Sequence, residues 1–215
     1  MIAGLTLPHK YMKSNQERLV ICLHGYGSSM DDLFSLAHDL SSIGHVVSLN
    51  APYSTPWGGS AWFDLDYSQD GSVRVSNTNQ IDESVVLLQK EIFSIQKTLG
   101  IAAKNTILLG FSQGAMMALE CAFRSKESLL AAVVLSGRGV NAEVPLVDST
   151  AIIQTHGVQD QVIPIGDARK LNVLLTKTMK NYVYQEYEDM GHGISPECWQ
   201  FVLSQLKSLT TNKVL

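Results

Sequence analysis

The stretch TILLGFSQGAMMAL, residues 106–119, decides the fold of this chain of 215 residues. The apolar residues 107–109 predict a buried strand, and the Ala- and Met-rich residues from Ala115 onward predict a helix. Gly110, Ser112 and Gly114 lie between them in a Gly-X-Ser-X-Gly pattern, whose glycines leave room for a sharp turn from strand to helix. Such a turn lifts the serine hydroxyl above the sheet and beside the helix N-terminus, so the sequence predicts Ser112 as a nucleophile.

Short apolar runs recur along the chain and predict six strands, at residues 18–24, 44–50, 105–110, 130–136, 150–156 and 182–187. Most are continuously apolar, which is typical of parallel strands covered on both faces, whereas residues 182–187 alternate and predict an edge strand. Five segments with helical spacing complete the pattern, at residues 31–43, 79–99, 112–124, 167–180 and 196–209. This alternation predicts an α/β fold in one domain of residues 1–215, with a mostly parallel sheet and helices on both faces.

The composition excludes several classes of protein. With 16 Lys+Arg against 20 Asp+Glu the net charge is −4, and no basic cluster is present, which argues against nucleic-acid binding. The 45% of hydrophobic residues argue against disorder, and the longest apolar run, residues 129–135, is far shorter than the ~18 residues of a membrane-spanning helix. The N-terminus shows no secretory signal, and the 3 cysteines form no disulfide framework. These features predict a soluble cytoplasmic protein.

A serine hydroxyl is too weak an acid to attack unaided, so a base is expected further along the chain. In a strand–turn–helix arrangement of this kind the expected order is nucleophile, acid, base. His192 lies in a Gly-His-Gly loop after the last predicted strand, where it can reach the carboxyl edge of the sheet. His156 also ends a predicted strand and is the second candidate. We therefore expect His192 to be the base.

Four aspartates follow Ser112 and are candidates for the carboxylate that orients the base. Asp160 comes directly after a buried strand, which is the position such a carboxylate needs. Asp148 precedes that strand and Asp167 falls where a helix begins, so neither is favoured. Asp189, three residues before His192, remains the rival to Asp160.

The oxyanion that forms when the serine attacks needs two backbone N–H donors. Gln113, directly after the nucleophile, is expected to supply one of them. The loop LHGYG, residues 23–27, follows the first long strand, and its glycines allow the backbone to fold closely over the site. We expect the second donor to come from this loop.

Five motifs occur in a fixed order, at residues 23–27 (LHGYG), 61–64 (AWFD), 110–114 (GFSQG), 156–164 (HGVQDQVIP) and 190–192 (MGH). Together they resemble those of the small carboxylesterase/phospholipase family that includes the acyl-protein thioesterases. The resemblance covers residues 18–208 and implies an α/β-hydrolase fold with no separate cap domain. It implies Ser112, Asp160 and His192 as a catalytic triad, with the backbone N–H groups of Leu23 and Gln113 as the oxyanion hole.

The resemblance also bears on substrate and partners. It implies hydrolysis of a small acyl ester, a lipid or an acyl-protein without a metal or cofactor, and it makes a homodimer an expectation. The long segment of residues 51–76, in which a short strand around residues 61–65 is expected, carries Trp57, Trp62 and Phe63. These aromatic side chains are expected to form an apolar acyl-binding groove.

Three departures from the family pattern bear on substrate choice. Ala115 stands where the family has a second glycine, Ser60 stands where an arginine is common, and residues 136–139 (SGRG) replace a more apolar stretch. None of them touches the proposed triad. The last two leave the substrate open.

Two other functions compete with this interpretation. A metal-dependent hydrolase is disfavoured, because no His-X-His or His-X-X-X-His spacing indicates a ligand set. A non-catalytic protein could keep the same fold and hold a small apolar ligand in its pocket. A complete triad in the expected order argues against that alternative, since a receptor would lose nothing by losing one of its members.

Overall fold

The computed structural model describes residues 2–67, 73–75, 77–140 and 149–211. Its centre is a seven-stranded sheet in the order β1-β3-β2-β8-β9-β10-β11. The strands are β1 (His9–Met12), β2 (Leu19–Leu23), β3 (His45–Leu49), β8 (Thr106–Phe111), β9 (Ala131–Leu135), β10 (Ala151–Gly157) and β11 (Tyr182–Tyr187). All neighbouring pairs are parallel except β1 and β3. The predicted mostly parallel sheet is confirmed.

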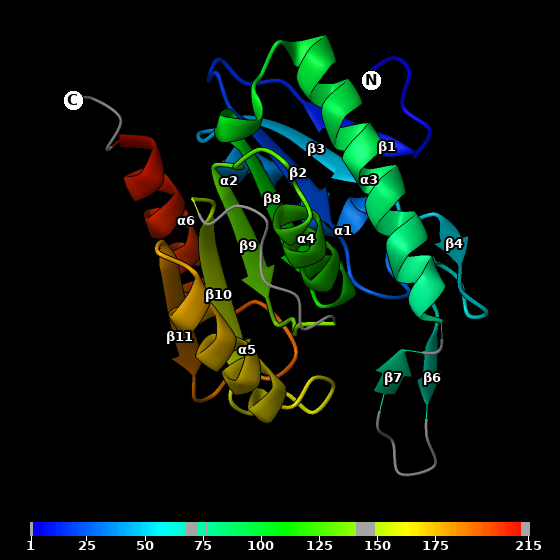
Figure 1. Ribbon diagram of the computed structural model, residues 1–215, viewed down its shortest axis with the longest axis vertical. Helices are drawn as coiled ribbons and strands as arrows, with labels where there is room; N and C mark the ends of the chain where they lie inside the picture. The colour runs from blue at the N-terminus through cyan, green and yellow to red at the C-terminus, as the bar shows by residue number, and fades with distance from the viewer. Residues whose placement is uncertain (1, 68–72, 76, 141–148, 212–215) are drawn as a thin grey trace.

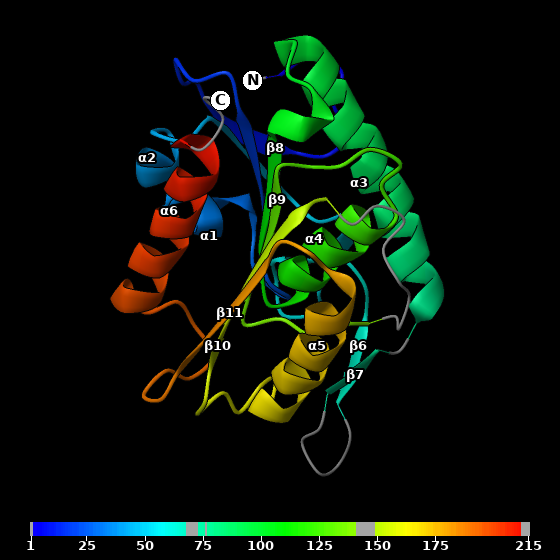
Figure 2. The ribbon, with the colours of Figure 1, turned by 60° about the vertical axis from the view of Figure 1, so that its left-hand side comes forward.

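Helices cover both faces of this sheet (Figures 1 and 2). On one face lie α3 (Thr78–Leu99), α4 (Gln113–Phe123) and α5 (Ile165–Thr178), and on the other lie α1 (Met30–Phe34), α2 (Ala37–Leu40) and α6 (Pro196–Thr211). Successive residues of one strand enter different cores: Ile21 packs with the α3–α5 side and Cys22 with the α1, α2 and α6 side. A strand buried on both faces has no polar face to show, which explains the continuous apolar runs in the sequence.

The predicted helix of residues 31–43 is wrong in its continuity. The structure has two short helices, α1 and α2, with a break at Ser35 and Leu36. The Ser35 hydroxyl donates to the Asp32 carbonyl over 2.6 Å, and the Ser35 N–H bonds within the same turn. A serine that satisfies backbone groups locally competes with helix propagation, and the apolar spacing of this segment does not reveal that competition.

The sequence does not predict β1, and it misplaces one strand in the segment of residues 51–76. β1 is short and carries Lys10 and His9 among half-buried side chains, so it lacks an apolar run. The short strand expected at residues 61–65 is replaced by two hairpins. These are β4 (Tyr53–Ser54) with β5 (Ser60–Ala61), and β6 (Leu65–Tyr67) with β7 (Val73–Val75).

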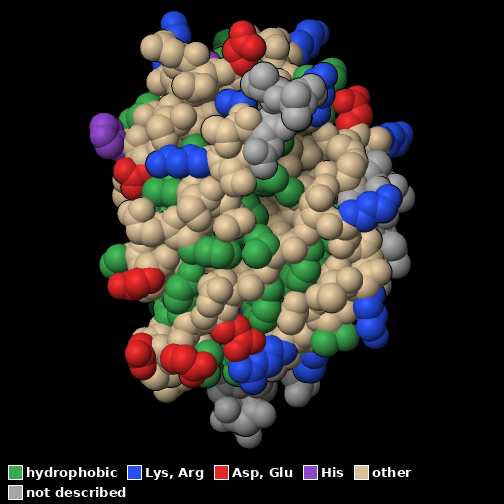
Figure 3. All heavy atoms as spheres, turned by 90° about the vertical axis from the view of Figure 1, so that its left-hand side faces the viewer, with side chains coloured by type: hydrophobic (Ala, Val, Ile, Leu, Met, Phe, Trp, Pro, Cys, Tyr) green, Lys and Arg blue, Asp and Glu red, His purple; other side chains and the backbone are tan. Residues whose placement is uncertain are grey.

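The edge position predicted for residues 182–187 is confirmed, because β11 pairs with β10 alone. Figure 3 shows the molecule from this side, with hydrophobic side chains gathered across the middle of the face and charged ones towards its two ends. No helix among the described residues is both long and apolar enough to cross a membrane. That the chain forms one domain stays a prediction.

Candidate active site

Ser112 lies in a sharp turn between β8 and α4, as the glycine pattern predicts. Its backbone has φ 55° and ψ −116°, a left-handed conformation that a non-glycine residue adopts only under strain. A Cβ on Gly110 would overlap the carbonyl of Gly114, and a Cβ on Gly114 would overlap the carbonyl of Leu23. The two glycines are therefore required because backbone segments pass at the distance of direct contact.

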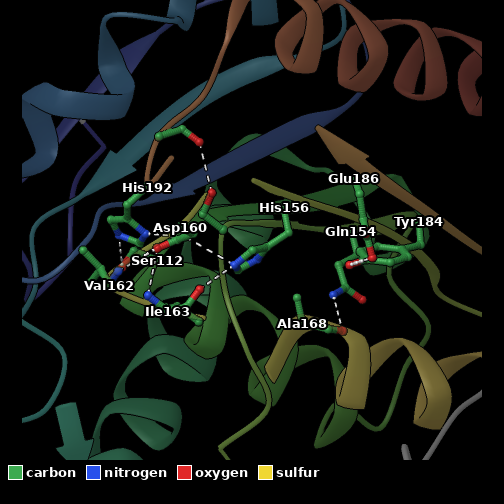
Figure 4. Close-up of polar contacts among 12 residues, drawn as sticks. Ser112, Gln154, His156, Asp160, Val162, Ile163, Ala168, Tyr184, Glu186 and His192 are labelled. Atoms are coloured by element: carbon green, nitrogen blue, oxygen red, sulfur yellow. Dashed lines mark hydrogen bonds and ion pairs between the residues drawn. The ribbon is translucent and has the colours of Figure 1, made fainter. Parts of the chain in front are cut away.

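The structure brings Ser112, His192 and Asp160 into one hydrogen-bonded line (Figure 4). His192 Nε2 lies 2.9 Å from Ser112 Oγ, and His192 Nδ1 lies 2.8 Å from Asp160 Oδ2. Ser112 follows β8, Asp160 follows β10 and His192 follows β11, so all three come from loops at the carboxyl ends of parallel strands. Such loops meet at one edge of the sheet, which explains why residues 80 positions apart in sequence touch.

The Asp160 carboxylate is buried and fully supplied with donors. Its Oδ1 accepts the backbone N–H groups of Val162 (2.9 Å) and Ile163 (2.8 Å). Burial by itself raises the pKa of Asp160, but hydrogen bonds from His156, His192 and the Ile163 N–H outweigh burial. The pKa of this carboxyl is therefore held well below its usual range, and the group is a carboxylate at neutral pH.

The ionised Asp160 fixes the tautomer of His192. A carboxylate only accepts hydrogen bonds, so Nδ1 of His192 carries the proton and donates it to Asp160. Nε2 is then the free acceptor that faces the Ser112 hydroxyl. The imidazole also lies on Phe111, with ring centroids 5.0 Å apart, which restricts its rotation. This arrangement presents a base to the serine in a single orientation.

The rival residues take other places. Asp189 is exposed, and His192 pairs with Asp160 instead. His156 bonds to the Ile163 carbonyl over 2.8 Å, and His192 is the imidazole that contacts Ser112. Asp167 lies in the first turn of α5, and Asp148 lies outside the described residues. In the part of the chain that the structure describes, no group of three or more His, Cys, Asp or Glu side chains could hold a metal ion.

The predicted oxyanion donors differ in how well the structure places them. Gln113 is the first residue of α4 and lines the cavity next to Ser112, so its backbone lies at the helix N-terminus. Leu23 is wrong in position: it is the last residue of β2, buried and paired with both Leu49 and Gly110 within the sheet, and it does not line the cavity. Gly25 and Tyr26, further along the same loop, do line it.

The predicted aromatic groove is also wrong. Trp62 and Phe63 have no exposed surface and pack within the core on the α3–α5 side. Trp57 is 79% exposed and lies between β4 and β5, and it does not line the cavity beside Ser112. The aromatic residues of the segment 51–76 do not reveal from sequence which of their side chains point into the core.

The buried Trp62 instead supports the loop that covers the site. Its indole N–H donates to the His24 carbonyl over 2.9 Å, and its backbone N–H donates to Oε1 of Gln113 over 2.8 Å. The His24 ring accepts the Ala51 N–H at Nε2, so its Nδ1 donates to the Gly25 carbonyl over 2.7 Å. Burial lowers the pKa of His24, which agrees with this neutral form. The network fixes the backbone of the residues 24–25 beside Ser112.

A cavity of about 360 Å³ opens at the Ser112 hydroxyl. Its apolar wall is formed by Leu65, Phe111, Met116, Val162, Ile163 and Pro164, and its charged residues are Asp32, Arg138 and Asp167. The helical spacing of Met116, four residues after Ser112, predicts a core residue; Met116 is indeed buried in the core, and it also lines this cavity. Arg138, from the departing SGRG stretch, does lie in the cavity, where Nη1 is 3.7 Å from Asp167.

Comparison with known proteins identifies the family of this chain. The sequence pattern of the phospholipase/carboxylesterase family matches residues 10–210. Esterase YpfH of Escherichia coli is 30% identical over 198 residues, which cover 89% of this chain and 82% of that protein. Acyl-protein thioesterase 1 of Saccharomyces cerevisiae is 28% identical over 236 residues, covering 95% and 97% of the two chains.

Solved structures show the same architecture. The crystal structure of esterase PE8 superposes with a TM-score of 0.87 at 26% identity, over 95% of this chain and 100% of that one. A Bacillus cereus carboxylesterase has a TM-score of 0.83 at 18% identity, over 95% of each chain, and supports the fold alone. The chain therefore belongs to the phospholipase/carboxylesterase family and has the α/β-hydrolase fold.

Proposed function

We propose that this protein is a serine hydrolase that cleaves carboxylic esters or thioesters through a covalent acyl-enzyme on Ser112. The observation that carries the proposal is the continuous hydrogen-bonded line from Ser112 Oγ through His192 to the ionised Asp160, at the mouth of a cavity. An accessible hydroxyl, an oriented imidazole and a buried carboxylate are the three groups that acyl transfer to serine requires.

The reaction follows from these distances. His192 Nε2 removes the Ser112 proton across 2.9 Å as Oγ attacks the carbonyl carbon of the substrate. The tetrahedral intermediate collapses when His192 returns that proton to the leaving alcohol or thiol, and the acyl group stays on Ser112. A water molecule then gives a proton to His192 and attacks the acyl carbonyl. His192 returns this proton to Ser112 Oγ as the second tetrahedral intermediate collapses, which releases the acid and restores the serine. Asp160 stays ionised throughout and stabilises the imidazolium form of His192.

The negative charge of the intermediate needs donors that are already in place. We assign one to the backbone N–H of Gln113, at the N-terminus of α4 where the helix dipole also favours negative charge. The second is assigned to the backbone of the residues 25–26, because these residues line the cavity where Leu23 does not. The hydrogen bonds of His24 and Trp62 support this loop from behind.

The cavity favours a small acyl group. Its volume of about 360 Å³ is at the low end of the range for ligand sites, and its apolar wall suits a short hydrocarbon chain. The named relatives include esterases and acyl-protein thioesterases, so either an oxygen or a sulfur leaving group is consistent with the family. Turnover of p-nitrophenyl esters of increasing acyl length, with acyl-thioesters and lysophospholipids alongside, identifies the preferred class. Cytoplasmic location and a homodimer stay predictions.

Labelling with a fluorophosphonate probe tests the proposal against a non-catalytic binding function. The probe reacts with a serine only when a base activates it, so the wild type should be labelled and Ser112→Ala should not. Ser48→Ala is the matched control, because Ser48 is a buried serine of β3 that bonds to the Met30 carbonyl and does not line the cavity, and it should leave labelling intact. A folded wild type that stays unlabelled and hydrolyses no ester would reject the hydrolase function.

A further inference from the structure

A second imidazole contacts the catalytic carboxylate from the side opposite His192. His156, next to last in β10, is fully buried, and its Nε2 lies 2.8 Å from the Ile163 carbonyl and 3.3 Å from Asp160 Oδ2. Figure 4 shows Asp160 between the two rings. The reaction described above does not use His156.

The surroundings determine which nitrogen of His156 carries the proton. Both neighbours of Nε2 are oxygen acceptors, whereas Nδ1 is buried without a hydrogen-bond partner among the described residues. A proton on Nδ1 would be a buried N–H donor without an acceptor, and Nε2 would then face two oxygen atoms with no proton to donate. This tautomer has a higher free energy than the one in which Nδ1 is an unprotonated nitrogen without a partner. His156 is therefore the tautomer protonated at Nε2, and this N–H is shared between Ile163 and Asp160.

Few other charges face this ring. Glu186 lies beside His156 in the β10–β11 register, but its carboxylate is engaged by Arg169 (2.6 and 2.9 Å) and by the Tyr184 hydroxyl (2.8 Å). The neighbouring strand β9 is apolar and ends at Leu135 opposite Thr155, where the uncharged Ser136 follows, and α6 contributes the thiol of Cys198 to Thr155. Asp160 is thus the charged group that His156 contacts directly.

We propose that His156 is a positioning residue that sets the basicity of His192 through Asp160. The inference rests on the proposed function of the triad. Oδ2 of Asp160 accepts the hydrogen bond of His192 and also lies 3.3 Å from Nε2 of His156. The negative charge of Oδ2 that interacts with His156 is therefore not available to His192. Loss of the His156 N–H makes Asp160 a stronger acceptor for His192 and lets the carboxylate rotate. The protonated form of His192 is then better stabilised.

Three substitutions separate this role from simple packing. In His156→Gln the side-chain amide ends near the position of Nε2 and can still donate to Asp160. In His156→Asn the shorter amide ends near the position of Nδ1 and cannot, and His156→Leu fills the space with no donor. The pH at half-maximal kcat/KM should rise by about one unit in the Asn and Leu variants and stay near the wild-type value in the Gln variant.

Circular dichroism across the same pH range shows whether each variant stays folded, so a loss of stability is not mistaken for the shift. NMR titration of the His192 ring protons gives the same midpoint without turnover, which separates this proposal from the proposed function. If the enzyme is inactive but the ring titration shifts as expected, His156 is still a positioning residue and only the hydrolase function fails. Equal midpoints in wild type and all three variants would overturn the role of His156.

Discussion

The turn at Ser112 and the loop at Asp160 both present one side chain of the proposed triad at the same edge of the sheet, but they are built differently. The Ser112 turn depends on missing side chains: Gly110 and Gly114 let backbone segments touch. The Asp160 loop depends on polar partners, with two backbone N–H groups and two imidazoles around one carboxylate. Steric exclusion fixes the first and hydrogen bonding fixes the second, so each should fail in its own way.

The largest effect should come from closing the space in the Ser112 turn. Gly114→Ala places a methyl group against the Leu23 carbonyl, and we expect a loss of at least about 3 kcal/mol in unfolding free energy or no folded protein. Gly166→Ala is the matched control, because no atom lies within 4 Å of its Cβ position in α5, and it should stabilise the protein by about 0.5 kcal/mol. Urea unfolding measures both. Equal stability of the two variants would contradict the steric account.

Removing the charge in the Asp160 loop should instead destroy activity and leave the fold. Asp160→Asn still accepts at one oxygen, but the neutral amide no longer stabilises protonated His192 or enforces its tautomer. We expect kcat to fall by about 10⁴-fold while the circular dichroism spectrum stays that of the wild type. Asp189→Asn is the control and should lose little, because Asp189 is exposed and unconnected to His192 in the described contacts. The reverse result would reassign the carboxylate.

The same loop should make stability depend on acid pH. The pKa of Asp160 is lower in the folded protein than in the unfolded chain, so the ionised group stabilises the fold above about pH 4. This contribution is lost as the pH falls below that value, because the unfolded chain takes up the proton first. The stability difference between wild type and Asp160→Asn should therefore shrink between pH 5 and pH 3 in urea unfolding. A stability difference that stays constant over this pH range would show that folding does not lower the pKa of Asp160.

The smallest expected effects separate the two tryptophans. Trp62→Phe removes the hydrogen bond to the His24 carbonyl behind the oxyanion loop, and we expect about a tenfold loss in kcat with unchanged preference for acyl length. Trp57→Ala should change neither, since Trp57 is exposed and does not line the cavity. A change of acyl-length preference in Trp57→Ala would restore its predicted role in binding substrate.

This contrast also explains what the sequence could predict. Glycines required by close contact leave a fixed pattern, so the position of Ser112 between strand and helix was foreseeable. Asp160 and His192 were foreseeable from the order of the strands, because each loop follows one of them. Partners across the fold carry no such pattern. Nothing in the sequence near His156 shows that its ring meets Asp160.

The errors have the same origin. The long aromatic segment predicts a groove lined by Trp62 and Phe63, but both side chains are buried in the core. Leu65 is the residue of this segment that lines the cavity. The predicted oxyanion donor, Leu23, lies two to three residues before the residues 25–26 that line the cavity. The motif predicts which loop lies at the site but not the residue at which the backbone leaves the sheet. Tertiary packing determines which side chains are buried and at which residue a strand ends.

Gln113 contributes to the site through both its backbone and its side chain. Its backbone lies at the helix start beside Ser112, while its side chain holds the backbone of Trp62 and Phe63 at 2.8 and 2.7 Å. Replacing Gln113 by alanine removes only the side chain, so the measured effect would come from the lost hydrogen bonds to the backbone of Trp62 and Phe63. The backbone N–H of residue 113 would remain, and its proposed role as a donor would go untested. A backbone amide-to-ester replacement at residue 113 is the change that addresses the donor itself.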